Sequence, residues 1–262
     1  MKSLPVWFSE LQTLVEQVSQ QLRADYANKD KIKVSRKSDD SPVTEADTRA
    51  SQALVTGLKR MMPGVPVISE ELQSSHIIAS QRDTFWLVDP MDGTAEFMEG
   101  SGEFSINIAL IKDGQLELGL VAMPMLEQSF YGGRQYGAFV NGAALTPRTV
   151  GKHITAVGSR RGPYQGNWQD KLEAEGYIVD RREAGAAYKF CLIAAGDADI
   201  YPRPEGIMQW DTAAAHALLQ GAGGTIVDWQ GQELQYGGSD LSVPAFVAVA
   251  DTTILPVLTN QK

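Results

Sequence analysis

The apolar positions near the start of the chain follow the spacing of a helix. Leu11, Leu14, Val15, Val18 and Leu22 recur at intervals of three and four residues, which places them on one helical face. The sequence therefore predicts an amphipathic helix that packs this stripe against a core.

A second helix is predicted to begin near Thr44. A threonine three residues before Asp47 is a variant of the capping box, with Asp in place of Glu. Apolar residues continue at helical spacing until Pro63-Gly64, a pair that ends helices. The polar segment between the two helices, residues 28–41, is predicted to be a strand or loop with a solvated face.

Apolar runs in the rest of the first half predict an antiparallel sheet. The runs over 106–111 and 116–123 flank Asp113-Gly114, a dipeptide typical of hairpin turns. Further strands are predicted over residues 65–68, 85–88 and 128–131.

The second half of the chain alternates short strands with helices, which is typical of an α/β layer. Turn residues at Asn141-Gly142 and Pro147 separate it from the first half. We therefore predict an α+β domain over residues 1–145 and an α/β domain over residues 146–262. The predicted strands cover 155–158, 177–179, 199–201 and 225–229, and the predicted helices cover 168–175, 186–195 and 211–219.

Composition narrows the class of protein. With 262 residues, 43% of them hydrophobic, the chain can build a full core as one large domain or two small ones. The 32 acidic and 23 basic residues give a net charge of −9, which argues against a protein that coats nucleic acid. We also expect no signal peptide and no transmembrane segment.

The single Cys191 excludes an intrachain disulfide and is typical of a reducing compartment, so we expect a cytoplasmic protein. It stands in an apolar run and is predicted to be a small buried residue. His76, His153 and His216 lack metal-ligand spacing and are predicted to be surface or packed residues. Peripheral association with the inner membrane through a basic patch at Lys29–Lys37 stays open.

Acidic residues recur where predicted strands end and helices begin. They are Asp47, Glu70-Glu71, Asp89 with Asp92, and Asp211. Each also has a plain structural interpretation: Asp47 could complement a helix dipole, the glutamate pair could be a solvated turn, and Asp211 could be a helix N-cap.

The segment Asp89-Pro90-Met91-Asp92-Gly93-Thr94 is harder to explain structurally. An apolar strand delivers Asp89 at its end, and Pro90 stops the ladder because it has no amide hydrogen. Carboxylates and a carbonyl at Met91 are oxygen ligands of the kind Mg²⁺ prefers, and the amides of Gly93 and Thr94 suit a phosphate. The spacing is not the Asp-x-Asp of enzymes that form an aspartyl phosphate.

These segments resemble the Mg²⁺-dependent, lithium-sensitive inositol monophosphatase superfamily. The resemblance rests on residues 41–47, Glu70-Glu71, residues 89–94 and Trp210-Asp211-Thr212-Ala213, in order and at similar spacing. It implies a layered α-β-α-β-α sandwich of the sugar-phosphatase type, in which the domain over residues 1–145 binds metal and the domain over residues 146–262 lies on the substrate side.

Three more segments are similar to the 3′(2′),5′-bisphosphate nucleotidase branch, the CysQ-type proteins. They are residues 102–110, Lys189-Phe190-Cys191 and Tyr201-Pro202-Arg203. The chain departs from that branch at Ala95, where Lys is common, and at Ala186-Ala187-Tyr188, where Ser-Ser-Leu is common.

The resemblance implies a phosphomonoesterase in which a metal-activated water attacks the phosphate. It assigns Asp47 and Thr94 to orient and deprotonate that water, and it implies two or three Mg²⁺ ions. The implied metal ligands are Glu70, Asp89, the Met91 carbonyl, Asp92 and Asp211, with Glu71 toward a third ion. The implied substrate-binding residues are Gly93, Thr94 and Asp211, to which we add Lys189 and Arg203 as candidates for a second phosphate.

Three functions stay open at this point. The first is removal of the 3′-phosphate from adenosine 3′,5′-bisphosphate, giving AMP; the same chemistry on 3′-phosphoadenylyl sulfate would link the chain to sulfur assimilation. The second is hydrolysis of inositol 1-phosphate or another sugar phosphate. The third is metal-dependent phosphate binding without catalysis. Monomer and homodimer are both open.

Overall fold

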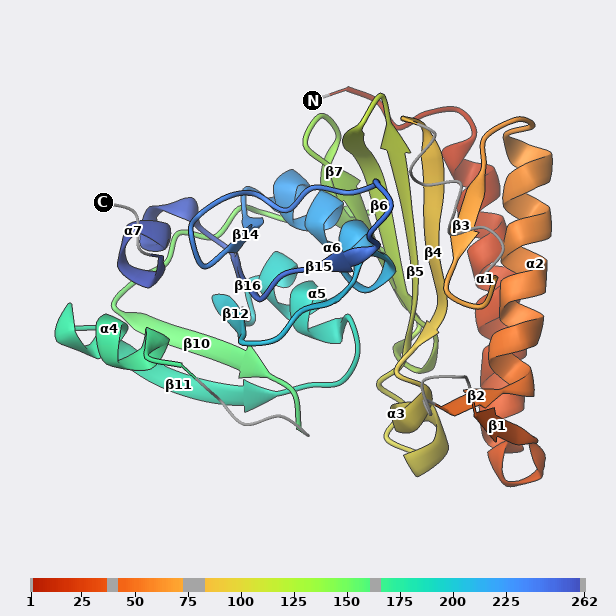
Figure 1. Cartoon of the computed structure of the whole chain (residues 1–262), viewed down its shortest axis with the longest axis horizontal. Helices are drawn as coiled ribbons and strands as arrows, with labels where there is room; N and C mark the ends of the chain where they lie inside the picture. Colours follow the sequence, from red (N-terminus) through yellow and green to blue (C-terminus); the bar gives the residue numbers. More distant parts are fainter. Residues whose placement is uncertain (1, 37–41, 73–82, 161–165, 260–262) are drawn as a thin grey trace.

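The chain folds into five alternating layers of helix and sheet (Figure 1). The computed structural model describes residues 2–36, 42–72, 83–160 and 166–259. Helices α1 (Phe8–Ala27) and α2 (Glu45–Met61) form the first layer, and α5 (Tyr188–Ala195) and α6 (Gln209–Ala222) form the third. Helices α4 (Trp168–Ala174) and α7 (Leu255–Leu258) form the last. The predicted α-β-α-β-α sandwich is confirmed.

The first sheet lies between the α1–α2 and the α5–α6 layers. Side chains of β5 alternate between its faces: Ile106 and Ile108 pack toward α1 and α2, and Ala109 and Ile111 pack toward α5 and α6. Because both faces are covered, the strand is continuously apolar from Ile108 to Ile111. The strand order is β3 (Val67–Ser69), β4 (Phe85–Asp92), β5 (Ser105–Lys112), β6 (Gln115–Met123), β7 (Gln128–Gly133), β8 (Gly137–Val140) and β9 (Ala143–Ala144), with only the β3–β4 pair parallel among these strands.

The second sheet mixes parallel and antiparallel pairs. Its order is β11 (Ile178–Glu183), β10 (His153–Gly158), β12 (Ile200–Arg203), β16 (Phe246–Val249) and β14 (Thr225–Asp228). Strand β16 pairs antiparallel with both β12 and β14, and the sequence pattern did not predict it. A four-residue apolar run near the end of the chain is too short to identify by periodicity alone.

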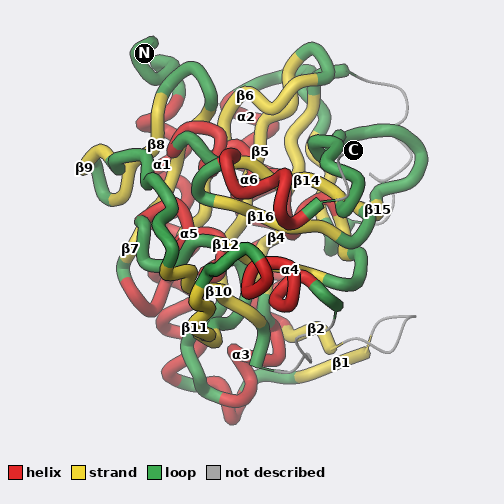
Figure 2. The backbone as a smooth tube through the Cα atoms, turned by 90° about the vertical axis from the view of Figure 1, so that its left-hand side faces the viewer, coloured by secondary structure: helices red, strands yellow, loops and turns green. Residues whose placement is uncertain are grey.

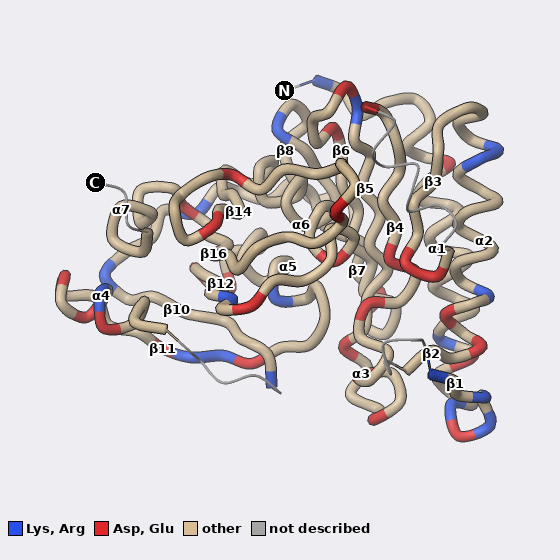
Figure 3. Tube along the Cα trace, viewed as in Figure 1, with Lys and Arg blue, Asp and Glu red and all other residues tan. Residues whose placement is uncertain are grey.

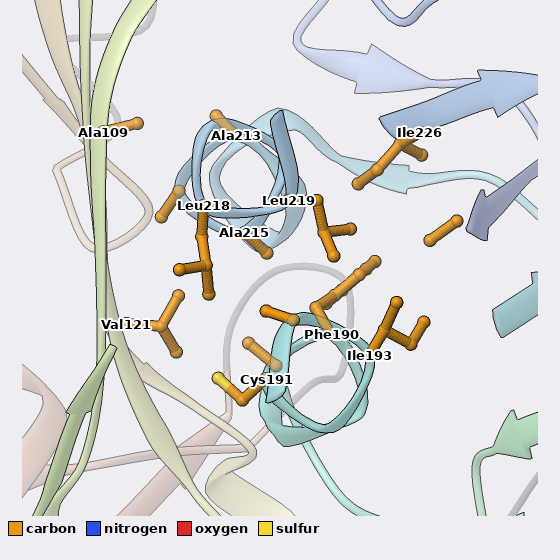
Figure 4. Packing of buried hydrophobic residues seen from close by; sticks show 14 of the residues in the cluster. Ala109, Val121, Phe190, Cys191, Ile193, Ala213, Ala215, Leu218, Leu219 and Ile226 are labelled. Atoms are coloured by element: carbon orange, nitrogen blue, oxygen red, sulfur yellow. The ribbon is translucent and has the colours of Figure 1, made fainter. Parts of the chain in front are cut away.

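Helix α6 approaches the first sheet backbone to backbone at Gly119. A Cβ built on Gly119 of β6 would lie 2.0 Å from the carbonyl oxygen of Ala214, so only glycine allows this approach. Alanines face both sheets from α6, and Leu218 and Leu219 fill the wider gaps around Phe190 and Val121 (Figure 4). The close contact fixes the height of α6 above the sheet.

Several local predictions are confirmed. The α2 capping box forms between Thr44 and Asp47, and the β5–β6 hairpin turns at Asp113 and Gly114, which have φ values of 52° and 72°. Both residues of a type I′ turn need positive φ. The polar segment after α1 contains a turn of 3-10 helix (Lys29–Lys31) and β1 (Val34–Arg36), which pairs with β2 (Pro42–Thr44).

Cys191 is buried in the core, as predicted, and His216, predicted to be a surface or packed residue, is buried there as well. The ring nitrogens of His216 lie 3.0 Å from the Tyr236 hydroxyl and 3.2 Å from the Thr225 hydroxyl. None of the described helices is long and apolar enough to cross a membrane. Figure 2 shows where helices, strands and loops lie along the backbone. The division into two domains at residue 145 stays a prediction.

Candidate active site

Asp47 lies in the first turn of α2, where its carboxylate is held from both sides. Its Oδ2 accepts hydrogen bonds from the Thr44 amide at 2.8 Å and the Thr44 hydroxyl at 2.6 Å. Its Oδ1 accepts a bond of 2.9 Å from the hydroxyl of Thr94, the first residue of α3 (Thr94–Glu99). The side chain is 2% exposed, and burial raises the pKa of Asp47 above its ordinary value. The structure thus brings together the two residues predicted to be catalytic.

The end of β4 carries two more of the predicted acids. Asp89 is buried, and its Oδ1 accepts a 3.0 Å hydrogen bond from the Met91 amide. The pairing with β5 is irregular between Asp89 and Asp92, where Pro90 cannot donate to the ladder. The irregularity lets Asp89 and Asp92 both lie close to α6.

Asp211 approaches the same place from α6. It occupies the third position of that helix and accepts a 3.0 Å hydrogen bond from the Met208 amide, so the alternative interpretation as an N-cap is wrong. Carboxylate oxygens of Asp89, Asp92 and Asp211 lie within 4.8 Å of one another. Two segments far apart in the sequence therefore build one acidic cluster.

The negative charges of this cluster disfavour one another. Burial raises the pKa of Asp89 well above its ordinary value, and the charges of Glu70, Asp92 and Asp211 raise it further. Burial, followed by the charges of Asp92 and Glu70, raises the pKa of Asp211 to about 8. Burial also raises the pKa of Asp92, although the positive charge of Lys189 opposes the shift.

A divalent cation would relieve this repulsion. The residues present fit such an ion, because closely spaced carboxylate oxygens are the ligands that Mg²⁺ and similar hard cations take. Glu70, in the turn after β3, lies close enough for its charge to act on all three aspartates, and Glu71 beside it is half-buried. Met91, at the same end of β4, is also buried.

Backbone and small side chains form the surface beside the cluster. Gly93 has a φ of 91°, and a Cβ built on it would lie 3.1 Å from the Cβ of Ala186. A Cβ on Gly185 would lie 2.9 Å from the Glu103 carbonyl oxygen. The loop at residues 184–187, just before α5, thus lies close against the turn that carries Gly93. As predicted, Gly93 and Thr94 open a helix, although α3 is short.

Lys189 lies on α5 and is only 6% exposed, so it is not a solvated helix residue. Its ammonium donates to the carbonyl oxygen of Ala186 at 2.7 Å and of Ala184 at 3.4 Å, and it lies 5.3 Å from the centre of the Tyr201 ring. Lys189 therefore holds the loop at residues 184–187 and places positive charge near Asp92.

Arg203 ends β12 and is partly buried. Its Nη1 donates a 2.9 Å hydrogen bond to the Tyr201 hydroxyl, and its buried Nε has no hydrogen-bond partner within the protein. Basic positions otherwise gather along β11 and around β1, whereas acidic positions flank the lower end of β4 (Figure 3).

The sequence analysis missed two polar residues that contact the cluster. Ser105 and Asn107 are 0% and 1% exposed, and both lie 3.4 Å from Oδ2 of Asp92. The signal was present, because the strand alternates Ser-Ile-Asn-Ile and polar residues at i and i+2 share one face.

The chain is similar in sequence to known proteins. The inositol monophosphatase family matches residues 7–260. The chain is 39% identical over 210 residues to the 3′(2′),5′-bisphosphate nucleotidase CysQ of Escherichia coli K12, covering 78% of this chain and 82% of that protein. It is 37% identical over 214 residues to the CysQ of Salmonella typhimurium, covering 78% and 83%.

Solved structures show the same fold. The crystal structure of CysQ from Bacteroides thetaiotaomicron, described as a bacterial member of the inositol monophosphatase family, superposes with a TM-score of 0.76. The match has 28% identity and covers 90% of this chain and 94% of that one.

Proposed function

Because the chain belongs to the inositol monophosphatase family, we propose that it is a metal-dependent phosphomonoesterase of the bisphosphate nucleotidase type. It removes the 3′-phosphate of adenosine 3′,5′-bisphosphate, giving AMP and phosphate, and acts in the same way on 3′-phosphoadenylyl sulfate. The observation that carries the proposal is the acidic cluster of Asp89, Asp92 and Asp211 beside the Asp47–Thr94 pair. The cytoplasm suits a chain with one buried cysteine.

Magnesium is the proposed cofactor, in two or three ions. Glu70, Asp89, the Met91 carbonyl, Asp92 and Asp211 would hold the ions, with Glu71 toward a third. When bound, the metal lowers the pKa of a water and neutralises charge on the phosphate. Since the family is metal-dependent, the mutual repulsion of these carboxylates supports the assignment.

Asp47 and Thr94 would move the proton of the attacking water. The Thr94 hydroxyl donates its proton in a hydrogen bond to Asp47, so the hydroxyl oxygen of Thr94 can accept a hydrogen bond from a water. As the water loses its proton to Thr94, the threonine proton passes to Oδ1 of Asp47. Thr44 holds Oδ2, so the accepting oxygen keeps its direction. The raised pKa of Asp47 makes it a better base near neutral pH.

The substrate would lie against the surface formed by Gly93, Thr94 and the loop at residues 184–187. Amides of Gly93 and Thr94 at the start of α3 suit the oxygens of the reacting phosphate, beside Asp211. Arg203 and Lys189 would hold the second phosphate. Both cations lie beside Tyr201, because Arg203 donates to its hydroxyl and the Lys189 ammonium lies 5.3 Å from the centre of its ring. The third N–H of Lys189, beyond its two carbonyl contacts, also supports this assignment.

A phosphate-release panel tests the proposal. The full-length chain is assayed with Mg²⁺ on adenosine 3′,5′-bisphosphate, 3′-phosphoadenylyl sulfate, inositol 1-phosphate and fructose 1,6-bisphosphate, with and without lithium. We expect the adenosine bisphosphate to give the highest kcat/KM and lithium to inhibit. A higher kcat/KM for inositol phosphate would replace the nucleotide assignment, and binding of the substrates without phosphate release would refute catalysis.

A further inference from the structure

The strand β5 places two polar side chains directly beneath the acidic cluster. In the register of the β4–β5 pair, Asn107 is opposite Asp89 and Ser105 is opposite Asp92. Opposed residues of an antiparallel pair point to the same face of the sheet. Both side chains are almost completely buried, so their polar atoms need partners within the protein.

The hydrogen bonds available to these groups form one consistent chain. The Ala187 amide lies 3.4 Å from the Ser105 hydroxyl, which lies 3.0 Å from Oδ1 of Asn107. The Asn107 amide nitrogen lies 3.4 Å from Oδ2 of Asp92. Since a serine hydroxyl has one proton, the shorter distance directs that proton to Asn107 rather than to Asp92 at 3.4 Å.

Ser105 and Asp92 favour the same orientation of the Asn107 amide. If the amide were reversed, its carbonyl oxygen would face the Asp92 carboxylate, and two acceptors would repel each other. In the observed orientation the amide oxygen accepts from the Ser105 hydroxyl and the amide N–H donates to Asp92.

The chain of hydrogen bonds also joins the two sides of the site. Ala187 is the N-cap residue of α5, and its amide is one of the helix-start donors that require an acceptor. Ser105 supplies that acceptor from the other side of the site. The position of the loop at residues 184–187 is therefore linked to the orientation of Asp92.

We propose that Ser105 and Asn107 are positioning residues for metal binding: Ser105 orients the Asn107 amide, which orients Asp92 as a metal ligand. This rests on the proposed role of Asp92 in holding the metal. Partners that orient a metal ligand typically contribute 10–100-fold to metal affinity or activity.

Metal titration without substrate tests the proposal. Binding of Mn²⁺ and Mg²⁺ to the full-length chain is measured by isothermal titration calorimetry for the unaltered protein and for Asn107→Leu, Ser105→Ala and Ser105→Thr. We expect Asn107→Leu to weaken metal binding roughly 10-fold or more. We expect Ser105→Ala to weaken it less, and Ser105→Thr, which keeps the hydroxyl, to restore most of the loss.

The double variant separates orientation from a general structural effect. If Ser105 acts through Asn107, adding Ser105→Ala to Asn107→Leu causes no further loss of metal affinity. Thr225→Val is the matched control. Thr225 is also buried and donates a 2.8 Å hydrogen bond to a carboxylate, that of Glu233, but both residues follow the C-terminal end of α6, whereas Asp211 lies at its start. It should lower the Tm of the metal-free chain and leave metal affinity unchanged.

Two results would overturn the proposal while leaving the function intact: metal affinity of Asn107→Leu within twofold of the unaltered chain, or losses that multiply in the double variant. Failure of the unaltered chain to bind either metal would instead overturn the metal-dependent function together with this inference.

Discussion

Thr94 donates a 2.9 Å hydrogen bond to Oδ1 of Asp47, although the two residues stand 47 positions apart in the sequence and on different helices. The contact joins the start of α2 to the turn that follows the acidic strand end. Since the other carboxylate oxygen is held by Thr44, the remaining oxygen of Asp47 faces Thr94 and, in the proposed mechanism, the attacking water.

Asp47→Asn should lower kcat by roughly 10²–10⁴-fold, because an amide cannot accept the proton of the attacking water. Asparagine can still accept the Thr44 amide bond, so the start of α2 should persist. Steady-state kinetics with calorimetric Mg²⁺ titration checks both expectations. Thr94→Ser, which keeps the hydroxyl, is the control and should retain much more activity than Thr94→Val. Unchanged turnover in Asp47→Asn would remove Asp47 from the mechanism.

Arg203→Ala should raise KM for adenosine 3′,5′-bisphosphate by roughly 10–100-fold, since a hydrogen bond to a charged group contributes about 1.5–3 kcal/mol. KM for inositol 1-phosphate should change little, because that substrate has no second phosphate. Kinetics on both substrates measures the difference. Equal effects on the two substrates would refute a selective role for Arg203.

Lys189→Ala should also raise KM more for the bisphosphate than for inositol phosphate. Because its ammonium also lies near Asp92 and holds the loop at residues 184–187, we expect an additional loss of kcat on both substrates. Lys189→Arg serves as the comparison that keeps the charge. If KM rises equally for both substrates, Lys189 stabilises the site without binding the second phosphate.

The metal-free protein should become less stable as the pH rises from about 4 to about 8. A carboxyl whose pKa is raised by folding stabilises the folded chain while it is protonated. That contribution is present below the unfolded pKa of about 4 and is lost as the pH passes the folded value, about 8 for Asp211. Asp89 and Asp92 shift in the same direction.

Magnesium should therefore raise Tm more at about pH 8 than at about pH 5.5, because it stabilises the ionised carboxylates. Thermal melts in chelator and in excess Mg²⁺ across this range provide the measurement. Asp211→Asn should reduce both the pH dependence and the gain from Mg²⁺, whereas Asp113→Asn in the β5–β6 turn should alter neither. Identical gains at both pH values would contradict the expectation.

Gly119→Ala should destabilise the fold by roughly 1–3 kcal/mol, the usual cost of overpacking. The added Cβ would meet the backbone of Ala214, so α6 must move and carry Asp211 with it. Metal affinity should fall together with stability in denaturant melts. Gly151→Ala is the control, because a Cβ there meets nothing within 4 Å. If Gly119→Ala leaves both stability and metal affinity unchanged, α6 can move away from the sheet without disturbing the site.

Structural features that depend on residues close together in the sequence could be predicted from it. Thr44 and Asp47 form a capping box within one helical turn, and Asp113-Gly114 forms the turn of the β5–β6 hairpin, so a short segment is enough to identify each. The burial of Lys189 could not be predicted, since it depends on carbonyls presented by the loop at residues 184–187. The position of β16 between β12 and β14 likewise depends on pairing between distant segments.

The small residues that meet at the turn around Gly93 have a consequence for how this protein can change over evolution. Gly93, Gly185 and Ala186 come together beside the proposed phosphate site, with the side chain of Glu96 packed against them. Main-chain amides are present whatever the residue, so mutation cannot easily remove the amides proposed to bind the phosphate; it can only obstruct them with a larger side chain. Selection for a new substrate would therefore act on the rim, at positions such as Arg203, while the chemistry at the centre is inherited unchanged.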